Sequence, residues 1–388
     1  MKILVTSNKD SKRVSLVPDD VNKLVANNIE VYITSNTTKL CGFSANDYVK
    51  AGAHIVDKLT IDFIKSIDIV SFIDFPEDKL IINNLNPKQI LWGFMFLVNN
   101  PKNLFIALKK GLTTIGVEAI NDNDVYEYFL PMEQIKAGCI LELANKAIAA
   151  CKISKRKQPK NKNSENTNNN ILKNNVLILN YSYSGYYAAK NVLANKYNVV
   201  YLEKDNTLAN ELRSDHNLQS LIIKNGCHFN VIDASYDNLI DEVKKTNILI
   251  ATNQLPTTKS SVRITNDMIN SMPRGSVFIN LDAETGFASN FENKPTTINK
   301  PWTTDNGVSY ISIENMCDMF PIDASKIISK LNAKNFMALV GDPDFHKMLT
   351  TNNKFKQAIM TYKHCLTNKE IASSLHLKYT FIDIIKKV

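Results

Sequence analysis

The sequence has no apolar run long enough to cross a membrane. Its most apolar stretch, residues 90–98 (ILWGFMFLV), is far shorter than the roughly 20 residues of a spanning helix, and it is typical of a buried strand. The chain begins with MKILVTSNKD, which turns polar after one short apolar run and so argues against a signal peptide. We therefore expect a cytoplasmic protein.

Cysteine and histidine patterns that bind metals are also missing. The six cysteines are scattered singly without a C-x-x-C pair, and the six histidines share no metal-ligand spacing. We expect free thiols in a reducing compartment, structural histidines and no metal.

The excess of basic residues does not indicate nucleic acid. Part of the net charge of +8 lies in one tract, residues 155–175 (KRKQPKNKNSENTNNNILKNN), in which no aromatic residue stands between the lysines. Such a tract is too polar to bury a core. We interpret it as a solvated insertion and expect no nucleic-acid partner.

What the sequence does contain is an alternation of short apolar runs and helical patterns along both halves of the chain. With 388 residues, of which 44% are hydrophobic, it can form two domains of ordinary size. The alternation predicts an α/β fold with two doubly wound Rossmann-like domains and a cleft between them. We expect an N-terminal domain at 1–130 completed by about 324–388, a connecting helix at 131–152, a polar insertion at 153–175 and a second domain at 176–323.

One stretch, residues 176–205, has the order of a dinucleotide-binding βαβ unit. An apolar run is followed by small and aromatic residues, a helical pattern, a second apolar run and an acid, Glu203, at the distance expected of a ribose ligand. Of the fingerprint G-x-G-x-x-G only the third glycine, Gly185, is present, because Asn180 and Ser182 replace the other two. Taken alone, the pattern favours a plain α/β crossover that binds no ligand.

Six stretches, in order along the chain, resemble one known family. On them the chain resembles the alanine dehydrogenase and proton-translocating pyridine nucleotide transhydrogenase alpha-subunit family over essentially its whole length. The most specific match is residues 248–286, ILIATNQLPTTKSSVRITNDMINSMPRGSVFINLDAETG. The others are KRVSLVPDDVNKLV at 12–25, GFSANDYVKAGAHIV at 42–56, LWGFMFLVNNP at 91–101, DNGVSYISIENM at 305–316 and FKQAIMTYKHCLTNKEI at 355–371.

The resemblance is closest to the NAD(H)-binding alpha subunit of a proton-translocating transhydrogenase. It implies a homodimer that passes hydride from NADH to NADP(H) bound on a partner subunit. It also implies membrane-embedded partner subunits that move protons, so that this chain would lie on the inner face of the membrane as a peripheral protein.

Two aromatic residues distinguish this reading from an alanine dehydrogenase. The lysine and histidine that such enzymes use match Phe72 and Phe96 here. Phenylalanine can neither bind a substrate carboxylate nor exchange a proton, whereas direct hydride transfer between nicotinamides needs proximity and no proton relay. Amino-acid dehydrogenation is therefore our third hypothesis. The second is a diverged, non-catalytic binding or regulatory module, because residues 119–129 (AINDNDVYEYF) differ from the family's nicotinamide loop.

The resemblance also assigns candidate site residues. Arg13 matches an arginine of the interdomain cleft that could hold a carboxylate or a carboxamide, and its alternative role is an exposed arginine after a strand. Tyrosines crowd the fingerprint turn and could fill the space of a pyrophosphate. The candidate cofactor-binding residues are Asn180, Ser182, Gly185, Tyr186, Glu203, Thr252, Asn253, Gln254, Leu255 and Asp282.

Overall fold

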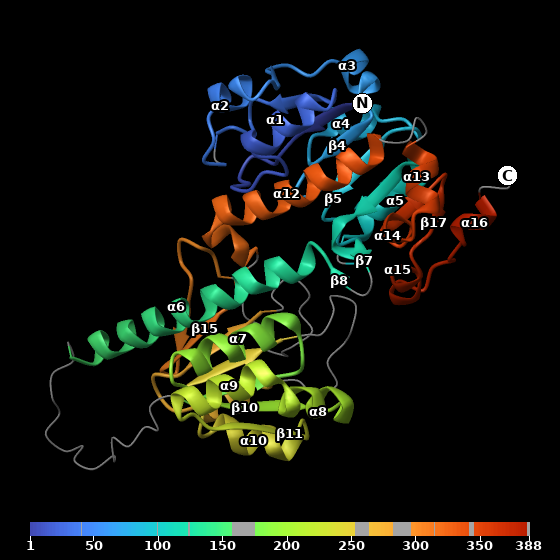
Figure 1. The fold of residues 1–388 in the computed structure, drawn as a ribbon. Coiled ribbons are helices and arrows are strands. Elements are labelled where there is room, and N and C mark those ends of the chain that lie inside the picture. The colour runs from blue at the N-terminus through green and yellow to red at the C-terminus, as the bar shows by residue number, and fades with distance from the viewer. Residues whose placement is uncertain are drawn as a thin grey trace, which may run out of the picture. The chain divides into compact units, whose positions relative to one another are not determined.

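The chain folds into two compact units. The computed structural model describes residues 1–39, 41–98, 100–122, 125–156, 175–252, 264–281, 296–313, 315–340 and 345–385. Unit 1 comprises Met1–Met132 and Phe320–Val388, and unit 2 comprises Glu133–Met319. The two ends of the chain therefore share unit 1, as the blue and the orange to red ribbons in Figure 1 show.

Unit 1 is built on an eight-stranded sheet with the order β17-β16-β6-β5-β4-β1-β2-β3. Strands β1 to β6 are parallel, β16 is antiparallel to β6, and β17 is antiparallel to β16. The strands are β1 (Lys2–Val5), β2 (Glu30–Thr34), β3 (His54–Val56), β4 (Ile69–Ser71), β5 (Ile90–Gly93), β6 (Thr113–Gly116), β16 (Ile359–Tyr362) and β17 (Cys365–Leu366), with a separate hairpin of β7 (Asn121–Asp122) and β8 (Val125–Tyr126).

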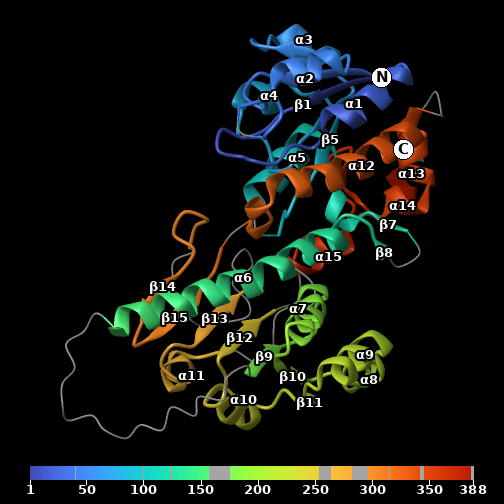
Figure 2. The same ribbon diagram turned by 60° about the vertical axis from the view of Figure 1, so that its left-hand side comes forward.

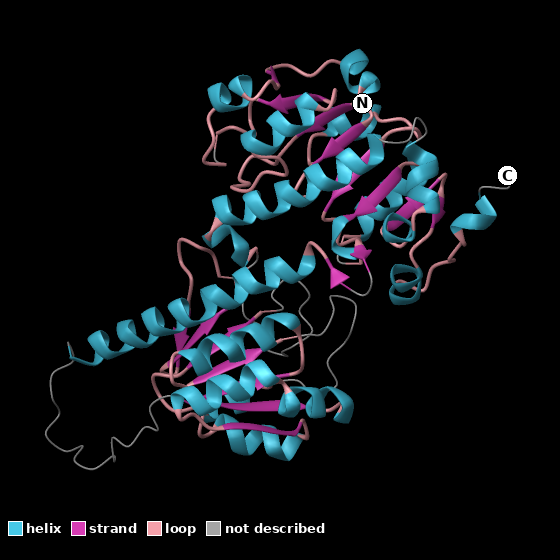
Figure 3. Ribbon diagram, viewed as in Figure 1, coloured by secondary structure: helices cyan, strands magenta, loops and turns pink. Residues whose placement is uncertain are grey.

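Helices cover both sides of this sheet (Figure 3), which explains why β4, β5 and β6 are buried along their whole length. The first helix begins at Pro18 with Asp19 and Asp20 in its first turn, as a helix start requires. The helices of unit 1 are α1 (Pro18–Ala26), α2 (Ala45–Lys50), α3 (Ile61–Ser66), α4 (Lys79–Asn84), α5 (Pro101–Lys110), η1 (Val117–Ala119), α12 (Pro321–Val340), α13 (Phe345–Thr351), α14 (Asn353–Lys356), α15 (Lys369–Ser374) and α16 (Ile382–Ile385).

Helix α12 attaches the C-terminal segment to the start of the chain. It packs against α1, and the two lie side by side in Figures 1 and 2. Ser325 and Ser329 accept hydrogen bonds from the backbone N–H groups of Val14 and Val17 at 3.0 and 2.9 Å. Serine is needed on this face because the two N–H groups are buried and would otherwise lack partners.

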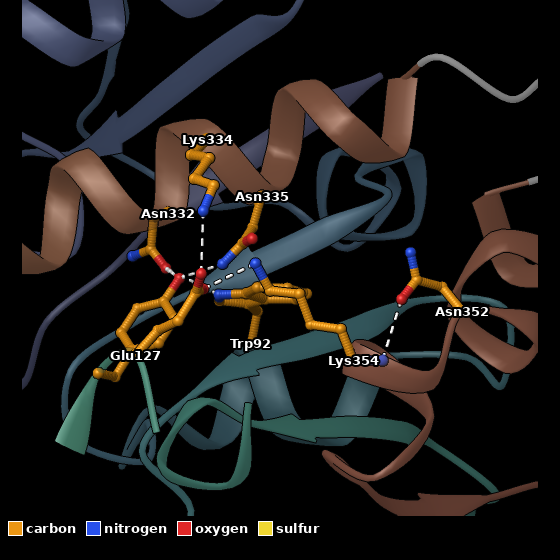
Figure 4. Close-up of polar contacts among 8 residues, drawn as sticks. Trp92, Glu127, Asn332, Lys334, Asn335, Asn352 and Lys354 are labelled. Carbon is orange, nitrogen blue, oxygen red and sulfur yellow. Dashed lines mark hydrogen bonds and ion pairs between the residues drawn. The ribbon is translucent and has the colours of Figure 1, made fainter. Parts of the chain in front are cut away.

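A second buried polar cluster joins α12 to the sheet (Figure 4). The Oδ1 of Asn332 accepts from Trp92 Nε1 and Tyr128 Oη, both at 2.8 Å, and its Nδ2 donates to the Ser15 carbonyl at 2.8 Å. Beside it, Glu127 pairs with the ammonium groups of Lys334 and Lys354 at 2.9 and 2.7 Å.

Unit 2 repeats the same topology with different strands. Its sheet has the order β11-β10-β9-β12-β13-β15-β14, parallel except for β14. The strands are β9 (Asn175–Leu179), β10 (Asn198–Glu203), β11 (Phe229–Asp233), β12 (Ile248–Ala251), β13 (Val277–Asn280), β14 (Thr303–Asp305) and β15 (Val308–Ile311). The helices are α7 (Tyr183–Ala194), α8 (Asn206–Ser214), α9 (His216–Asn225), α10 (Tyr236–Val243), α11 (Asn266–Ser271) and η2 (Met316–Met319).

The long helix α6 (Phe129–Arg156) leads from unit 1 into unit 2. Its residues Cys139, Leu143 and Ala147, spaced at four, are buried in the core of unit 2 together with strands β9 and β12. The α/β fold class and the two Rossmann-like units that the alternation predicts are both confirmed, because each sheet has the 3-2-1-4-5-6 strand order of that fold at its centre.

The apolar run at 90–98 is a strand only over its first part, so the prediction of one buried strand was too long. Strand β5 ends at Gly93, where an added Cβ would lie 2.4 Å from the ring of Phe72. The chain then turns, and Phe96 adopts a left-handed conformation with φ +39°. Hydrophobicity alone could not reveal this turn, because the residues after Gly93 remain largely buried.

The described residues contain no helix that is both long enough and apolar enough to cross a bilayer. Among the same residues, no group of histidine, cysteine and acidic side chains is placed to hold a metal ion. All six cysteines are free thiols.

Candidate functional site

The turn after β9 keeps a left-handed backbone conformation at the position of the first fingerprint glycine, although that glycine is replaced. Asn180 stands at that position with φ +64°, in the left-handed region that favours glycine. Asparagine is among the few other residues that adopt this conformation, because its short side chain can hydrogen-bond locally. Here Asn180 Nδ2 donates to the Thr252 carbonyl at 3.1 Å. Asparagine therefore preserves the conformational role of the first glycine.

At the second glycine position, Ser182 caps helix α7. Its side-chain oxygen accepts a hydrogen bond from the Gly185 N–H at 2.9 Å, and the residue is only 2% exposed. The cap occupies one of the N–H groups that a phosphate could otherwise bind at the start of the helix. The neighbouring Ser184 N–H makes no hydrogen bond within the described part of the chain. One donor is thus used by the protein, and the next has no partner among the described residues although Ser184 is only 3% exposed.

Gly185, the third glycine, is required by packing. A Cβ at this position would lie 2.4 Å from the hydroxyl oxygen of Tyr201 and 3.2 Å from Oγ1 of Thr252. Both hydroxyl groups donate to the Asn180 carbonyl, at 3.2 and 2.6 Å respectively. Burial raises the pKa of Tyr201 well above its ordinary value, so the phenol remains a donor. Helix α7 can approach the sheet this closely only because residue 185 has no side chain.

Glu203, the candidate ribose ligand, holds the turn itself. It ends β10 and is 8% exposed, so it is not an exposed acid after a strand. Its Oε2 accepts from the Tyr181 N–H at 2.5 Å and its Oε1 accepts from the Asp205 N–H at 2.8 Å. A carboxylate has about four acceptor positions. Glu203 can therefore accept hydrogen bonds from a ribose only in addition to these two.

The tyrosine side chains around the turn are held by contacts with other side chains. Tyr186 donates its hydroxyl proton to Asp215 at 3.1 Å, and its ring meets that of Tyr187 edge-on, with an interplanar angle of 74° and centroids 5.3 Å apart. The ammonium of Lys190 lies over both rings. Burial raises the pKa of the nearby Tyr181 to about 12. The hydroxyl of Tyr186 therefore binds at the N-terminus of α9 and not at that of α7.

The predicted site residues do not all lie together. The structure brings Asn180, Ser182, Gly185, Glu203 and Thr252 to one turn, and Thr252 is fully buried there. Arg13 belongs to unit 1, where it is 6% exposed and 3.8 Å from Asp74, so it is not the exposed arginine of the alternative reading. Asn253, Gln254, Leu255 and Asp282 lie outside the described residues.

In unit 1 the two phenylalanines that match a lysine and a histidine of alanine dehydrogenases each contact another aromatic ring. Phe72 is 1% exposed and contacts Phe75 edge-on, with ring centroids 5.8 Å apart. The ring of Phe96 stacks on that of Phe94 at 5.6 Å. Both side chains therefore contact other aromatic rings, and neither can bind a carboxylate or exchange a proton.

Glu118 is a functional candidate that the sequence reasoning missed. It is half-buried in η1, directly after β6, and its carboxylate accepts from the N–H groups of Met95 at 3.2 Å and Phe96 at 3.0 Å. Burial raises its pKa to about 6. The signal that could have found it is an acid placed just after the buried run of β6, the position where parallel sheets present their ligand-binding groups.

Comparisons with known proteins identify one family over most of the chain. The family described as alanine dehydrogenase/PNT matches with its N-terminal domain at residues 6–136 and with its C-terminal domain at residues 147–369. A curated relative, alanine dehydrogenase 1 of Staphylococcus aureus (strain MSSA476), is 24% identical over 371 residues, which cover 95% of this chain and 94% of the relative.

Two solved structures share the fold. An L-alanine dehydrogenase superposes with a TM-score of 0.75 at 18% identity, covering 97% of this chain and 99% of that one. A transhydrogenase from Sinorhizobium meliloti superposes with a TM-score of 0.67 at 17% identity, covering 95% and 99% of the two chains.

Proposed function

Because this chain belongs to the alanine dehydrogenase/PNT family of oxidoreductases, which bind NAD(H), we propose that its unit 2 binds NAD(H) and that the chain transfers hydride as a transhydrogenase alpha subunit. In this proposal NADH on this chain reduces NADP held by a partner subunit. The chain works as a homodimer on membrane-embedded partners at the inner face of the membrane.

Two features of the described residues support a dinucleotide site. The Ser184 N–H at the start of α7 can donate to a phosphate oxygen, and the positive end of the helix dipole favours that charge. Glu203 ends β10 next to the turn and has acceptor positions left for ribose hydroxyls. The nicotinamide ring supplies the hydride when the cofactor is bound. The protein's own contribution is to bind and orient it.

The observation that carries the choice of reaction is the apolar setting of Phe72 and Phe96. Oxidation of an amino acid at carbon needs a group that binds the substrate carboxylate and another that exchanges a proton. Phe72 lies in the core, and Phe96 is stacked on another phenylalanine. Transfer of hydride between two nicotinamides requires only that they be held close together. The chemistry available at these positions therefore favours the transhydrogenase reaction.

Two other functions have support of their own. The named relatives include alanine dehydrogenases, which favours that activity on sequence similarity alone. The turn itself favours a non-catalytic binding or regulatory module. Ser182 accepts from the Gly185 N–H, which a cofactor phosphate could otherwise bind, and Glu203 accepts from the Tyr181 N–H as well as being the candidate partner of a ribose.

A titration of the purified chain with NADH separates these functions. We expect nicotinamide fluorescence to increase and to saturate in the submillimolar range, and no response at millimolar NADH would exclude both enzyme functions. L-Alanine with NAD should yield no NADH. Turnover of alanine would instead show that another group replaces the missing lysine and histidine.

A further inference from the structure

Unit 1 contains a cavity of about 530 Å³ at the carboxyl ends of its parallel strands. Its lining comes from the segments that follow four neighbouring strands: Thr6 and Lys9 after β1, Asn36 after β2, Lys58 after β3 and Glu77 after β4. The volume lies within the usual range of sites for small ligands, roughly 300–1,000 Å³. The cavity is made by unit 1 alone.

The place of this cavity in the sheet matches that of the candidate dinucleotide turn in unit 2. The central strands follow the order β3-β2-β1-β4 in unit 1 and β11-β10-β9-β12 in unit 2. In such sheets ligands bind beyond the carboxyl ends of the strands, next to the point where the strand order reverses. The reversal in unit 1 lies between β1 and β4, and residues following both strands line the cavity.

The loop after β1 excludes a dinucleotide but leaves room for a smaller ligand. It contains no glycine, and α1 begins only at Pro18, so the loop presents no helix N-terminus to a pyrophosphate. The hydroxyl group of Thr6, which lines the cavity, makes no hydrogen bond within the described residues and is open to a ligand there.

The lining offers three kinds of group for one ligand. The lysines at positions 9 and 58 are exposed and have no ion pair within the described chain, so they are free to bind an anion. Asp57 and Glu77 supply carboxylates that can accept from a diol. Apolar side chains of Leu59, after β3, and Leu80, in α4, line the same cavity and suit the faces of a planar ring.

From this combination we propose that the cavity of unit 1 binds a nucleoside monophosphate, as a second nucleotide site separate from that of unit 2. The base packs between the apolar side chains, the carboxylates accept from the ribose hydroxyls, and Lys9 and Lys58 bind the phosphate. We infer a mononucleotide because the lining combines carboxylates, apolar side chains and two lysines, while the loop after β1 forms no pyrophosphate-binding turn.

Calorimetric titration of the full chain with 5′-AMP in the presence of saturating NADH tests the site. We expect AMP to bind, and Lys9→Ala or Lys58→Ala to weaken it about tenfold, as loss of one charge-assisted phosphate contact does. The matched control Lys109→Ala removes an equally exposed lysine of α5 and should change nothing. AMP affinity equal in wild type and both lysine variants would overturn the proposal.

Photolabelling with 8-azido-AMP locates the binding independently of those variants. Label on the peptides that contain residues 54–59 or 76–80 is expected and should persist under saturating NADH. Label confined to residues 176–205, and lost when NADH is added, would show that AMP binds only to unit 2 and would contradict a second site. Adenosine and inorganic phosphate should each bind more weakly than AMP.

Discussion

Gly185 shows how one missing side chain sets the distance between a helix and a sheet. We expect Gly185→Ala to lower the free energy of unfolding by about 1–3 kcal/mol, because its Cβ would meet the Tyr201 hydroxyl at 2.4 Å. Denaturant unfolding measures the change. In a Tyr201→Phe background the cost should shrink, and an unchanged cost would show that the hydroxyl is not the obstacle. Gly138→Ala in α6, where an added Cβ meets nothing within 4 Å, is the matched control and should be neutral or stabilising.

Glu118 makes stability depend on pH in a direction opposite to that of most carboxylates. Burial raises its pKa from 4.5 to about 6 in the folded chain. The folded state therefore binds more protons than the unfolded state between these values, and stability falls as the pH rises through that window. Glu118→Gln keeps an acceptor for the Met95 and Phe96 N–H groups. In this variant the free energy of unfolding should no longer fall between pH 4.5 and about 6 because of residue 118, and at neutral pH it should be higher by up to about 2 kcal/mol. Identical pH profiles in urea titrations would contradict the assignment.

At the scale of elements, the cap of α7 decides how much of the helix N-terminus is left for a ligand. Ser182→Gly removes the side chain that accepts from the Gly185 N–H, while glycine costs only a few tenths of a kcal/mol as an N-cap. We expect NADH to bind more tightly to this variant in a fluorescence titration. Ser235→Gly, which removes the comparable cap of α10, should leave NADH binding unchanged. No gain from Ser182→Gly would favour the non-catalytic module.

The elements around this turn illustrate what sequence can predict. The apolar runs of β9 and β10 and the helical pattern between them identify a βαβ unit, because periodicity and a single glycine are local signals. The partners of Asn180, Ser182 and Glu203 are not local, since each bonds to backbone groups whose positions depend on the folded turn. The same limit explains why the run at 90–98 was predicted to be longer than β5. Its turn is fixed by Glu118, which lies on another strand connection.

At the scale of the whole molecule, unit 1 depends on contacts between the two ends of the chain. The side-chain amide of Asn332 in α12 accepts hydrogen bonds from Trp92 and Tyr128 and donates one to the Ser15 carbonyl. We expect Asn332→Ala to destabilise the chain by about 3 kcal/mol, because it leaves several buried polar groups without partners. Asn84→Ala, which removes an exposed amide at the end of α4, should change stability by less than about 0.5 kcal/mol. Equal effects in thermal or denaturant unfolding would mean that the buried cluster contributes little.

The proposed reaction is tested most directly by hydride transfer to a second nucleotide. The purified chain is mixed with NADH and with the NADP-binding domain of a transhydrogenase loaded with thio-NADP, and reduction of the thio-nicotinamide is followed by its absorbance. We expect reduction that depends on both proteins and saturates with this chain, and no NADH formation from L-alanine and NAD. A chain that binds NADH but reduces no thio-NADP, or that oxidises alanine, would contradict the transhydrogenase function.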